Sequence, residues 1–256
     1  MSGNGVETLR VGEGTSGRDI AVLRRTGATP GIFWLGGFAS DMRGSKAEAL
    51  DAFAARSGRG FTRFDYSGHG ASGGAFADGT ISRWLEEARA VFATTEGPQV
   101  VVGSSMGGWL ALLLAEALRA ERRIAGLVLI APAVDMTRAL MFDQMSRKEK
   151  KQLAEEGAVA MPSDYSAAGY TITRTLVEDG DRHLFGARLI ETGCPVHILQ
   201  GVEDTDVPWQ HATALVSRLA SDDVVLTLVK DGDHRLSRPE DLERMTAAVE
   251  GVTAMD

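Results

Sequence analysis

Three side chains with complementary chemistry stand far apart in the sequence: Ser105, Asp204 and His234. A serine hydroxyl is a poor nucleophile at its own pKa, so it needs a neighbouring base, which in turn needs a third group to orient it. An imidazole and a carboxylate commonly fill these two roles. The order serine, acid, histidine along a chain is one that carries this chemistry. We therefore expect the three side chains to meet as nucleophile, orienting acid and base.

The residues around Ser105 favour this serine over its neighbour Ser104. Residues 100–102 are all valine and residues 109–118 are strong helix formers, so a strand and a helix flank the segment Gly103-Ser104-Ser105-Met106-Gly107. Only Ser105 has a glycine two positions before it and another two positions after it. A sharp turn from strand to helix needs glycine there because side chains would collide. The alternative is an ordinary glycine turn.

The orienting carboxylate should follow the strand expected at residues 195–200, where Glu203, Asp204 and Asp206 lie close together. We prefer Asp204 because it comes four residues before Pro208, which leads into the next helix. Asp206 and, less strongly, Glu203 remain alternatives. Asp204 could also serve only as a turn or cap residue.

The base should follow the last strand, residues 224–229, where His234 lies in a turn. Catalytic groups gather at the carboxyl ends of parallel strands. The other four histidines are expected to be packed or surface residues: His69 in a turn, His183 in an inserted segment, His197 in a strand and His211 on a helix.

Two backbone N–H groups should stabilise the oxyanion that forms when Ser105 attacks a carbonyl. One belongs to Met106, directly after the nucleophile, and the other to the loop after the third strand, where Phe38 is the preferred candidate. Losing one such donor typically costs roughly 3–4 kcal/mol of transition-state stabilisation.

Alternating strands and helices should hold these residues in place. We expect strands around residues 7–12, 19–24, 31–35, 61–66, 100–104, 126–131, 195–200 and 224–229, and helices over 45–56, 81–95, 109–118, 209–220 and 239–250. This alternation predicts a mostly parallel, doubly wound, eight-stranded sheet of the α/β-hydrolase fold. Ser45, with Glu48 three residues later, should cap the first helix.

The alternation stops between about residues 134 and 192, where no strand pattern appears. Apolar residues at helical spacing, a charged helix ending at Gly157 and a second helical piece at about 170–190 predict a small helical cap. We assign residues 134–193 to this cap and residues 1–133 and 194–256 to the core. The cap residues that could line an apolar substrate pocket are Met136, Leu140, Met141, Phe142, Met145 and Met161. They could equally pack the cap onto the sheet.

Composition limits the partners. The formal charge of −8 disfavours nucleic acid and anionic membranes, and the single cysteine, Cys194, rules out an internal disulfide. No stretch approaches transmembrane length. We expect a cytoplasmic protein without stable membrane insertion, and a reaction that needs neither metal nor organic cofactor. The oligomeric state stays open.

Motifs spread over the whole chain point to one family. They lie at residues 42–47, 63–68, 102–110, 204–209 and 233–235, with further matches at Lys150-Lys151 and Met161-Pro162-Ser163. With them the chain resembles the serine α/β-hydrolases and, more narrowly, the abhydrolase-domain-ten type of palmitoyl-protein thioesterases and acyl-glucuronide esterases. The resemblance implies Ser105 as nucleophile, Asp204 as acid and His234 as base. The chain starts without an Arg-rich transit segment, so a mitochondrial location is not expected.

These features predict acyl ester or thioester hydrolysis through an acyl-enzyme, with a small-molecule or protein-bound acyl substrate. Three alternatives remain: a short-chain carboxylesterase, a peptidase of the same fold, and a non-catalytic binding module.

Overall fold

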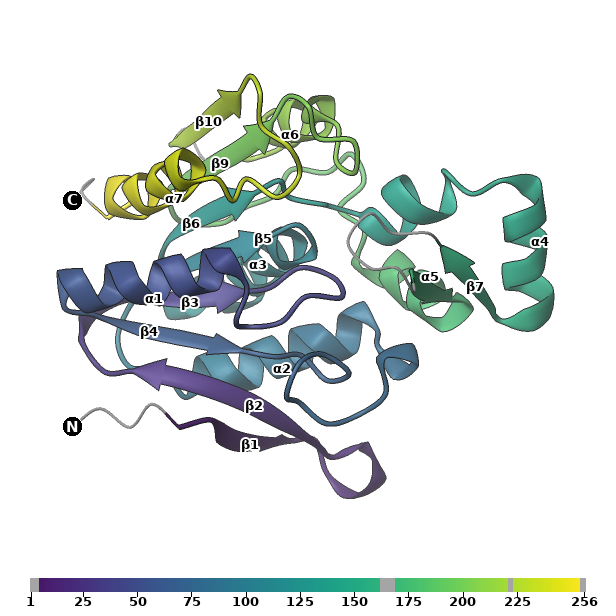
Figure 1. The fold of residues 1–256 in the computed structure, drawn as a ribbon, viewed down its shortest axis with the longest axis horizontal. Coiled ribbons are helices and arrows are strands. Elements are labelled where there is room, and N and C mark those ends of the chain that lie inside the picture. Colours follow the sequence, from purple (N-terminus) through teal and green to yellow (C-terminus); the bar gives the residue numbers. More distant parts are fainter. Residues whose placement is uncertain (1–4, 162–168, 221–222, 254–256) are drawn as a thin grey trace.

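An eight-stranded sheet forms the body of the computed structural model, which describes residues 5–161, 169–220 and 223–253 (Figure 1). The strand order is β1-β2-β4-β3-β5-β6-β9-β10. The strands from β4 to β10 in this order are parallel, whereas β2 pairs antiparallel with both β1 and β4. Their bounds are β1 Glu7–Val11, β2 Arg18–Arg25, β3 Ala28–Leu35, β4 Arg59–Phe64, β5 Gln99–Ser104, β6 Ile124–Ile130, β9 Val196–Gly201 and β10 Val224–Val229. The fold and sheet expected from the sequence are confirmed.

Helices cover both faces of this sheet (Figure 1). On one face, α1 (Ser45–Ser57) and α7 (Pro239–Gly251) pack against one apolar cluster. On the other, α2 (Ile81–Ala93), α3 (Met106–Leu118) and α6 (Trp209–Val216) pack against a second. Because both faces are covered, the central strand β5 is buried along its whole length, which explains the three consecutive valines at its centre.

The first helix begins differently from the expectation. Gly44 is the N-cap of α1 and no side chain caps it, so Ser45 is already the first helical residue and the predicted capping role of Ser45 is wrong. Glu48 instead accepts a bond from Arg63, which is buried. The glutamate therefore serves a tertiary contact rather than a local cap.

The inserted segment contains strands that the sequence pattern did not indicate. Besides a short π-helical stretch (Thr137–Phe142) and the helices α4 (Arg147–Glu156) and α5 (Arg174–Gly180), it holds an antiparallel pair, β7 (Ala158–Met161) and β8 (Tyr170–Thr173). The expectation of a strand-free insertion is therefore wrong, and the helix expected over about 170–190 begins only after β8 and is limited to α5 and a short 3₁₀ turn (Asp181–His183). Four-residue strands are too short to display a clear alternation in the sequence.

A separate small core holds this segment together. Met145 and Leu153 pack with Val159 of β7, Ile172 of β8 and Val177 of α5. Figure 1 shows α4 and β7 projecting away from the main sheet. Pro162 and Ser163, which carried part of the resemblance, lie outside the described residues.

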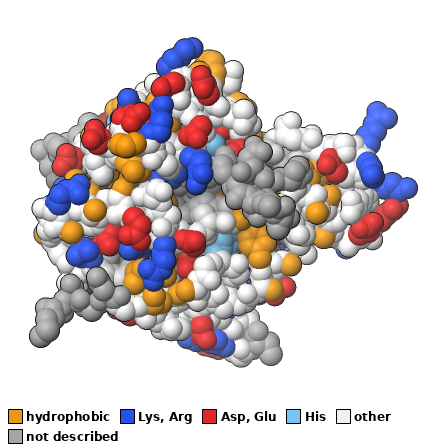
Figure 2. Space-filling view, viewed as in Figure 1, with side chains coloured by type: hydrophobic (Ala, Val, Ile, Leu, Met, Phe, Trp, Pro, Cys, Tyr) orange, Lys and Arg blue, Asp and Glu red, His pale blue; other side chains and the backbone are white. Residues whose placement is uncertain are grey.

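The surface carries both signs of charge, with Lys and Arg interspersed among Asp and Glu on the face shown in Figure 2. Within the described ranges, no helix has the length and apolar character needed to cross a bilayer.

Candidate active site

Ser105 sits at the sharp turn between β5 and α3, in a backbone conformation that L-residues rarely adopt. Its φ is 55° and its ψ is −117°. Its N–H donates to the carbonyl of Ile130 (2.9 Å), and its own carbonyl accepts from Gly108 (2.9 Å) and Ala133 (3.0 Å). These bonds hold the strained turn in place. Ser105 remains partly exposed, whereas its neighbours Ser104 and Met106 are buried.

The glycines on either side of Ser105 make this turn sterically feasible. A Cβ at Gly103 would lie 2.3 Å from the carbonyl oxygen of Gly107. A Cβ at Gly107 would lie 2.1 Å from the carbonyl oxygen of Leu35 in the neighbouring strand. The first glycine therefore closes the turn, as expected, and the second lets the turn approach the end of β3.

His234 links Ser105 to a buried carboxylate. Its Nε2 lies 3.1 Å from the Oγ of Ser105, and its Nδ1 lies 2.8 Å from Oδ2 of Asp204. The residues come from the ends of β5, β9 and β10, which meet at the carboxyl edge of the sheet. The structure thus brings together the three side chains that the sequence singled out.

Four hydrogen-bond contacts fix the Asp204 carboxylate, whose side chain is fully buried. Oδ1 accepts from the N–H groups of Asp206 (2.9 Å) and Val207 (2.8 Å). Oδ2 accepts from Nε2 of Gln200 (3.0 Å) besides contacting His234. The carboxylate that contacts Nδ1 of the imidazole is therefore the buried one of Asp204, whereas Glu203 and Asp206 are exposed.

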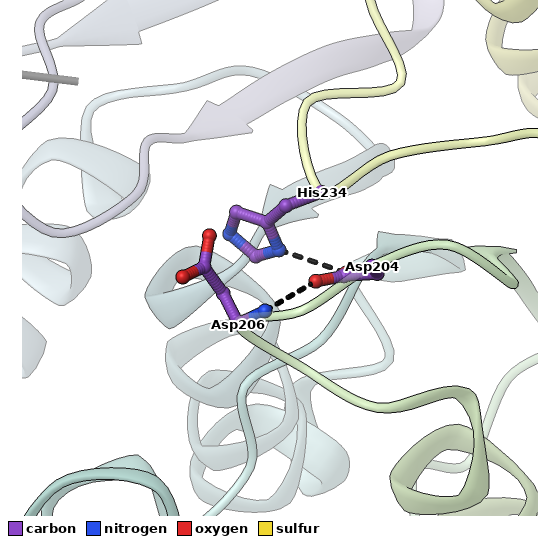
Figure 3. Close-up of side chains that lie close together, drawn as sticks. All are labelled: Asp204, Asp206 and His234. Atoms are coloured by element: carbon purple, nitrogen blue, oxygen red, sulfur yellow. Dashed lines mark hydrogen bonds and ion pairs between the residues drawn. The ribbon is translucent and has the colours of Figure 1, made fainter. Parts of the chain in front are cut away.

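Asp206 lies beside the same imidazole without replacing Asp204, as Figure 3 shows. Ligand atoms of Asp204, Asp206 and His234 lie within 4.8 Å of one another, close enough to hold a metal ion. However, both imidazole nitrogens already have protein partners, Nδ1 the carboxylate of Asp204 and Nε2 the hydroxyl of Ser105. The contacts among the three therefore fit proton transfer better than metal ligation.

The other four histidines have different contacts. His183 pairs with Oγ of Ser82 (2.7 Å), His197 with Oγ1 of Thr227 (2.9 Å) and His211 with the carbonyl of Val134 (2.8 Å). Burial lowers the pKa of each of these three histidines, so all three favour the neutral form. The fourth, His69, contacts the loop that holds Phe38, a relationship that the sequence did not reveal.

That loop passes close to Ser105. A Cβ added to Gly37 would lie 3.5 Å from the Cβ of Ser105, so only the width of a methyl group separates the backbone before Phe38 from the serine. The Phe38 ring packs edge-on against Phe76 (4.9 Å between centroids) and Tyr170 of β8 (5.4 Å). Phe38 therefore joins the surroundings of Ser105 to the inserted segment.

Lys46 also lies beside the site, although no sequence pattern marked its side chain as a contact of the His234 loop. From the first turn of α1 its Nζ donates to the carbonyl of Arg235, the residue after His234. Burial lowers the pKa of this lysine to about 8. Only a contact between residues far apart in sequence could reveal it.

The candidate pocket residues divide into two groups. Met136 and Met145 are 3% and 4% exposed and belong to the apolar cores of the body and the insertion, respectively. The remaining four are half-buried: Leu140, Met141, Phe142 and Met161. Only this second group has surface to offer a ligand.

Comparison with known proteins places the chain in a family. The profile of the family described as serine aminopeptidase, S33, matches residues 35–168. Mouse "palmitoyl-protein thioesterase ABHD10, mitochondrial" is 34% identical over 91% of this chain and 78% of its own length. The human protein of that name is 32% identical over 91% and 76%.

Comparison with solved structures supports the same family. A putative hydrolase from Agrobacterium vitis superposes with a TM-score of 0.94 at 51% identity, covering 97% of this chain and 98% of the other. Mouse ABHD10 gives 0.88 at 32% identity over 98% of both chains. The fold and these matches define the class as α/β-hydrolase. Within that class, the chain belongs to the ABHD10 type.

Proposed function

We propose that this protein is a serine hydrolase that cleaves acyl esters or thioesters through an acyl-enzyme on Ser105. The observation that carries the proposal is the continuous contact from the Asp204 carboxylate through the His234 ring to the Ser105 hydroxyl. The name palmitoyl-protein thioesterase, borne by the ABHD10 relatives, supports an S-acyl substrate within this class.

In the first half-reaction, Ser105 Oγ bonds to the acyl carbonyl carbon while its proton passes to Nε2 of His234. The carbonyl π electrons move onto oxygen. Asp204 keeps Nδ1 protonated and stabilises the imidazolium that forms. The oxyanion then restores the carbonyl and expels the thiolate or alkoxide, which takes the proton from His234. Water repeats the sequence on the acyl-enzyme, releasing the acid and restoring Ser105.

Two backbone donors are proposed for the oxyanion. Met106 is the first residue of α3, so its N–H has no acceptor within the helix. The N–H of Phe38 donates to no residue in the described part of the chain, although the loop passes close to Ser105. Both groups are thus available to a developing negative charge, and the positive end of the α3 dipole adds to them.

We further propose that residues 134–193 act as a cap and that its half-buried apolar residues hold the acyl chain. Leu140 and Met141 pack between cap and body, and Met161 ends β7. Each methylene of the substrate that leaves water contributes about 0.8 kcal/mol. With p-nitrophenyl esters and acyl thioesters of increasing length, kcat/KM should rise steadily beyond butyryl. An optimum at acetyl or butyryl would instead indicate a short-chain carboxylesterase.

The central test replaces Ser105. Ser105→Ala should abolish both turnover of p-nitrophenyl esters and labelling by a fluorophosphonate, with the circular dichroism spectrum unchanged. The matched control is Ser104→Ala, one residue away and buried at the end of β5, which should still be labelled. Labelling of Ser105→Ala at the native rate would refute the proposed nucleophile.

A peptidase is the second candidate, because the matching family is described as serine aminopeptidase. Aminoacyl p-nitroanilides assayed beside the esters separate the two activities. Amide turnover that exceeds ester turnover would favour the peptidase, and no turnover of any substrate would favour a binding module.

A further inference from the structure

His69 is nearly fully buried, 4% exposed, in the turn after β4, yet it is not one of the residues of the proposed proton relay. Its Nδ1 lies 3.1 Å from the carbonyl of Ser67, and its Nε2 lies 3.1 Å from the backbone nitrogen of Ala39. A carbonyl can only accept and an N–H can only donate. The two contacts therefore define a neutral ring protonated at Nδ1, with Nε2 as the acceptor.

Ala39 needs such a partner because its backbone is strained. Its φ is 56°, in the left-handed region, where a residue other than glycine costs of order 1–3 kcal/mol. The Ser40 N–H and hydroxyl both bond to the carbonyl of Gly37, closing a turn with Phe38 and Ala39 at its centre. A turn with positive φ only at its third residue is of type II, a position that favours glycine.

Packing of the Ala39 side chain does not explain this conformation, since Ala39 is exposed. What opposes relaxation is the bond to His69. A flip of the peptide between Phe38 and Ala39 would give the ordinary type I turn. The Ala39 N–H would then point away from Nε2 of His69, and the carbonyl oxygen of Phe38 would face the lone pair of Nε2 and be repelled by it. The neutral ring therefore favours the strained turn over the relaxed one.

His69 and Phe38 also share a wall of aromatic rings. The His69 ring lies 5.1 Å from Phe76 and 5.3 Å from Trp84, and the Phe38 ring lies 4.9 Å and 5.9 Å from the same two residues. The indole of Trp84 donates to the carbonyl of Ser67, which His69 also contacts. The imidazole is thus fixed from both sides and can hold the loop rigidly.

We infer that His69 is a positioning residue: its Nε2 holds Ala39 in the left-handed conformation and so anchors the turn that carries the Phe38 N–H beside Ser105. This inference rests on the proposed function. A correctly placed oxyanion donor stabilises the transition state more than it stabilises the bound substrate. Displacing this donor therefore lowers kcat with little effect on KM.

The test uses two substitutions that differ in which ring nitrogen they replace. His69→Gln can bring an amide oxygen to the position of Nε2, whereas His69→Asn reaches only the position of Nδ1. We expect kcat for a p-nitrophenyl ester to fall roughly tenfold to a hundredfold in H69N, short of the 10²–10³ for complete loss of a donor, and only a few-fold in H69Q. Equal losses in both variants, or a loss confined to KM, would overturn the inference.

A double-mutant cycle distinguishes positioning from general damage to the fold. Glycine adopts a positive φ without strain, so Ala39→Gly lowers the need for the bond to His69. The fall in kcat from A39G to H69N/A39G should therefore be at least threefold smaller than the fall from the native protein to H69N. Identical falls in both backgrounds would contradict the assigned role.

Failure of this inference remains distinct from failure of the proposed function. All these variants retain Ser105 and His234 and should react with a fluorophosphonate, whereas loss of the proposed function would appear in the Ser105→Ala experiment. If H69N is labelled and folded but hydrolyses the ester at the native rate, only the role of His69 is refuted.

Discussion

The N–H of Glu203 donates a 2.9 Å hydrogen bond to the carbonyl of Gly232. This bond joins the loop that presents Asp204 to the loop that presents His234. The two backbones approach so closely that a Cβ at Gly201 would lie 2.3 Å from the carbonyl oxygen of Gly232. The contact between carboxylate and imidazole therefore depends on a glycine that contacts neither side chain.

Replacing this glycine should separate the two loops. Gly201→Ala forces a Cβ against backbone atoms, which cannot move aside as a flexible side chain would. We expect the free energy of unfolding to fall by about 1–3 kcal/mol, as in other overpacked sites, and kcat to fall with it. Urea denaturation and ester kinetics measure the two. Gly251→Ala is a suitable control because an added Cβ there meets nothing within 4 Å. Native stability and kcat in Gly201→Ala would refute the steric argument.

The two neighbouring aspartates should differ sharply in importance. Asp204→Asn replaces the carboxylate that contacts Nδ1 of His234, which removes the stabilisation of the imidazolium and the control of its tautomer. By analogy with the serine protease triad, kcat should drop by ~10⁴. Asp206→Asn should cost less than about tenfold, because an exposed charge beside the ring is screened by water. Equal losses of kcat in Asp206→Asn and Asp204→Asn would contradict the assignment of the orienting role to Asp204.

Backbone strain at Ser105, the proposed nucleophile, predicts that activity is gained at the expense of stability. Because Ser105 has a φ of 55°, Ser105→Gly should relieve backbone strain, whereas Ser105→Ala removes only the hydroxyl. Glycine also raises the conformational entropy of the unfolded chain, and this cancels about 0.4–1 kcal/mol of the stability gained from the relieved strain. We expect the glycine variant to be more stable than the alanine variant by about 1 kcal/mol, with both inactive. Thermal or urea unfolding decides this, and a less stable glycine variant would show that the turn stores no strain.

Lys46 predicts a dependence of stability on pH. Burial lowers its pKa from 10.5 to about 8, the charge of Arg235 acts in the same direction, and Asp233, Asp241 and Asp204 oppose both. Between these two values the unfolded chain binds a proton that the folded chain does not. The free energy of unfolding attributable to Lys46 must therefore rise with pH over this window.

The comparison with Lys46→Met isolates this effect from all other titrating groups. The difference in unfolding free energy, native minus variant, should increase between pH 8 and 10.5 and stay level between pH 6 and 7. Urea denaturation at a series of pH values measures it. A difference that is flat or decreases across pH 8–10.5 would contradict the lowered pKa of the amine.

Much of the fold could be predicted because its information is local. The valines of β5, the glycines around Ser105 and the leucines of α3 specify strand, turn and buried helix within twenty consecutive residues. The eight-stranded sheet followed from similar runs along the chain. The β7–β8 pair could not be predicted in the same way, since its strands are four residues long and gain their stability from Met145, Leu153 and Val177 around them.

For the site, the sequence by itself determined which residue types were present, in which order, and at which strand ends they would lie. Only the tertiary structure decided that Asp204 contacts Nδ1 of the imidazole from a buried position, and that His69 and Lys46 contact the loops beside Phe38 and His234. The physical reason is the separation in sequence between the residues that interact. A turn or a helix is specified by neighbours in sequence, whereas a hydrogen bond between Ala39 and His69, or between Lys46 and Arg235, exists only once the sheet has brought distant loops to the same edge.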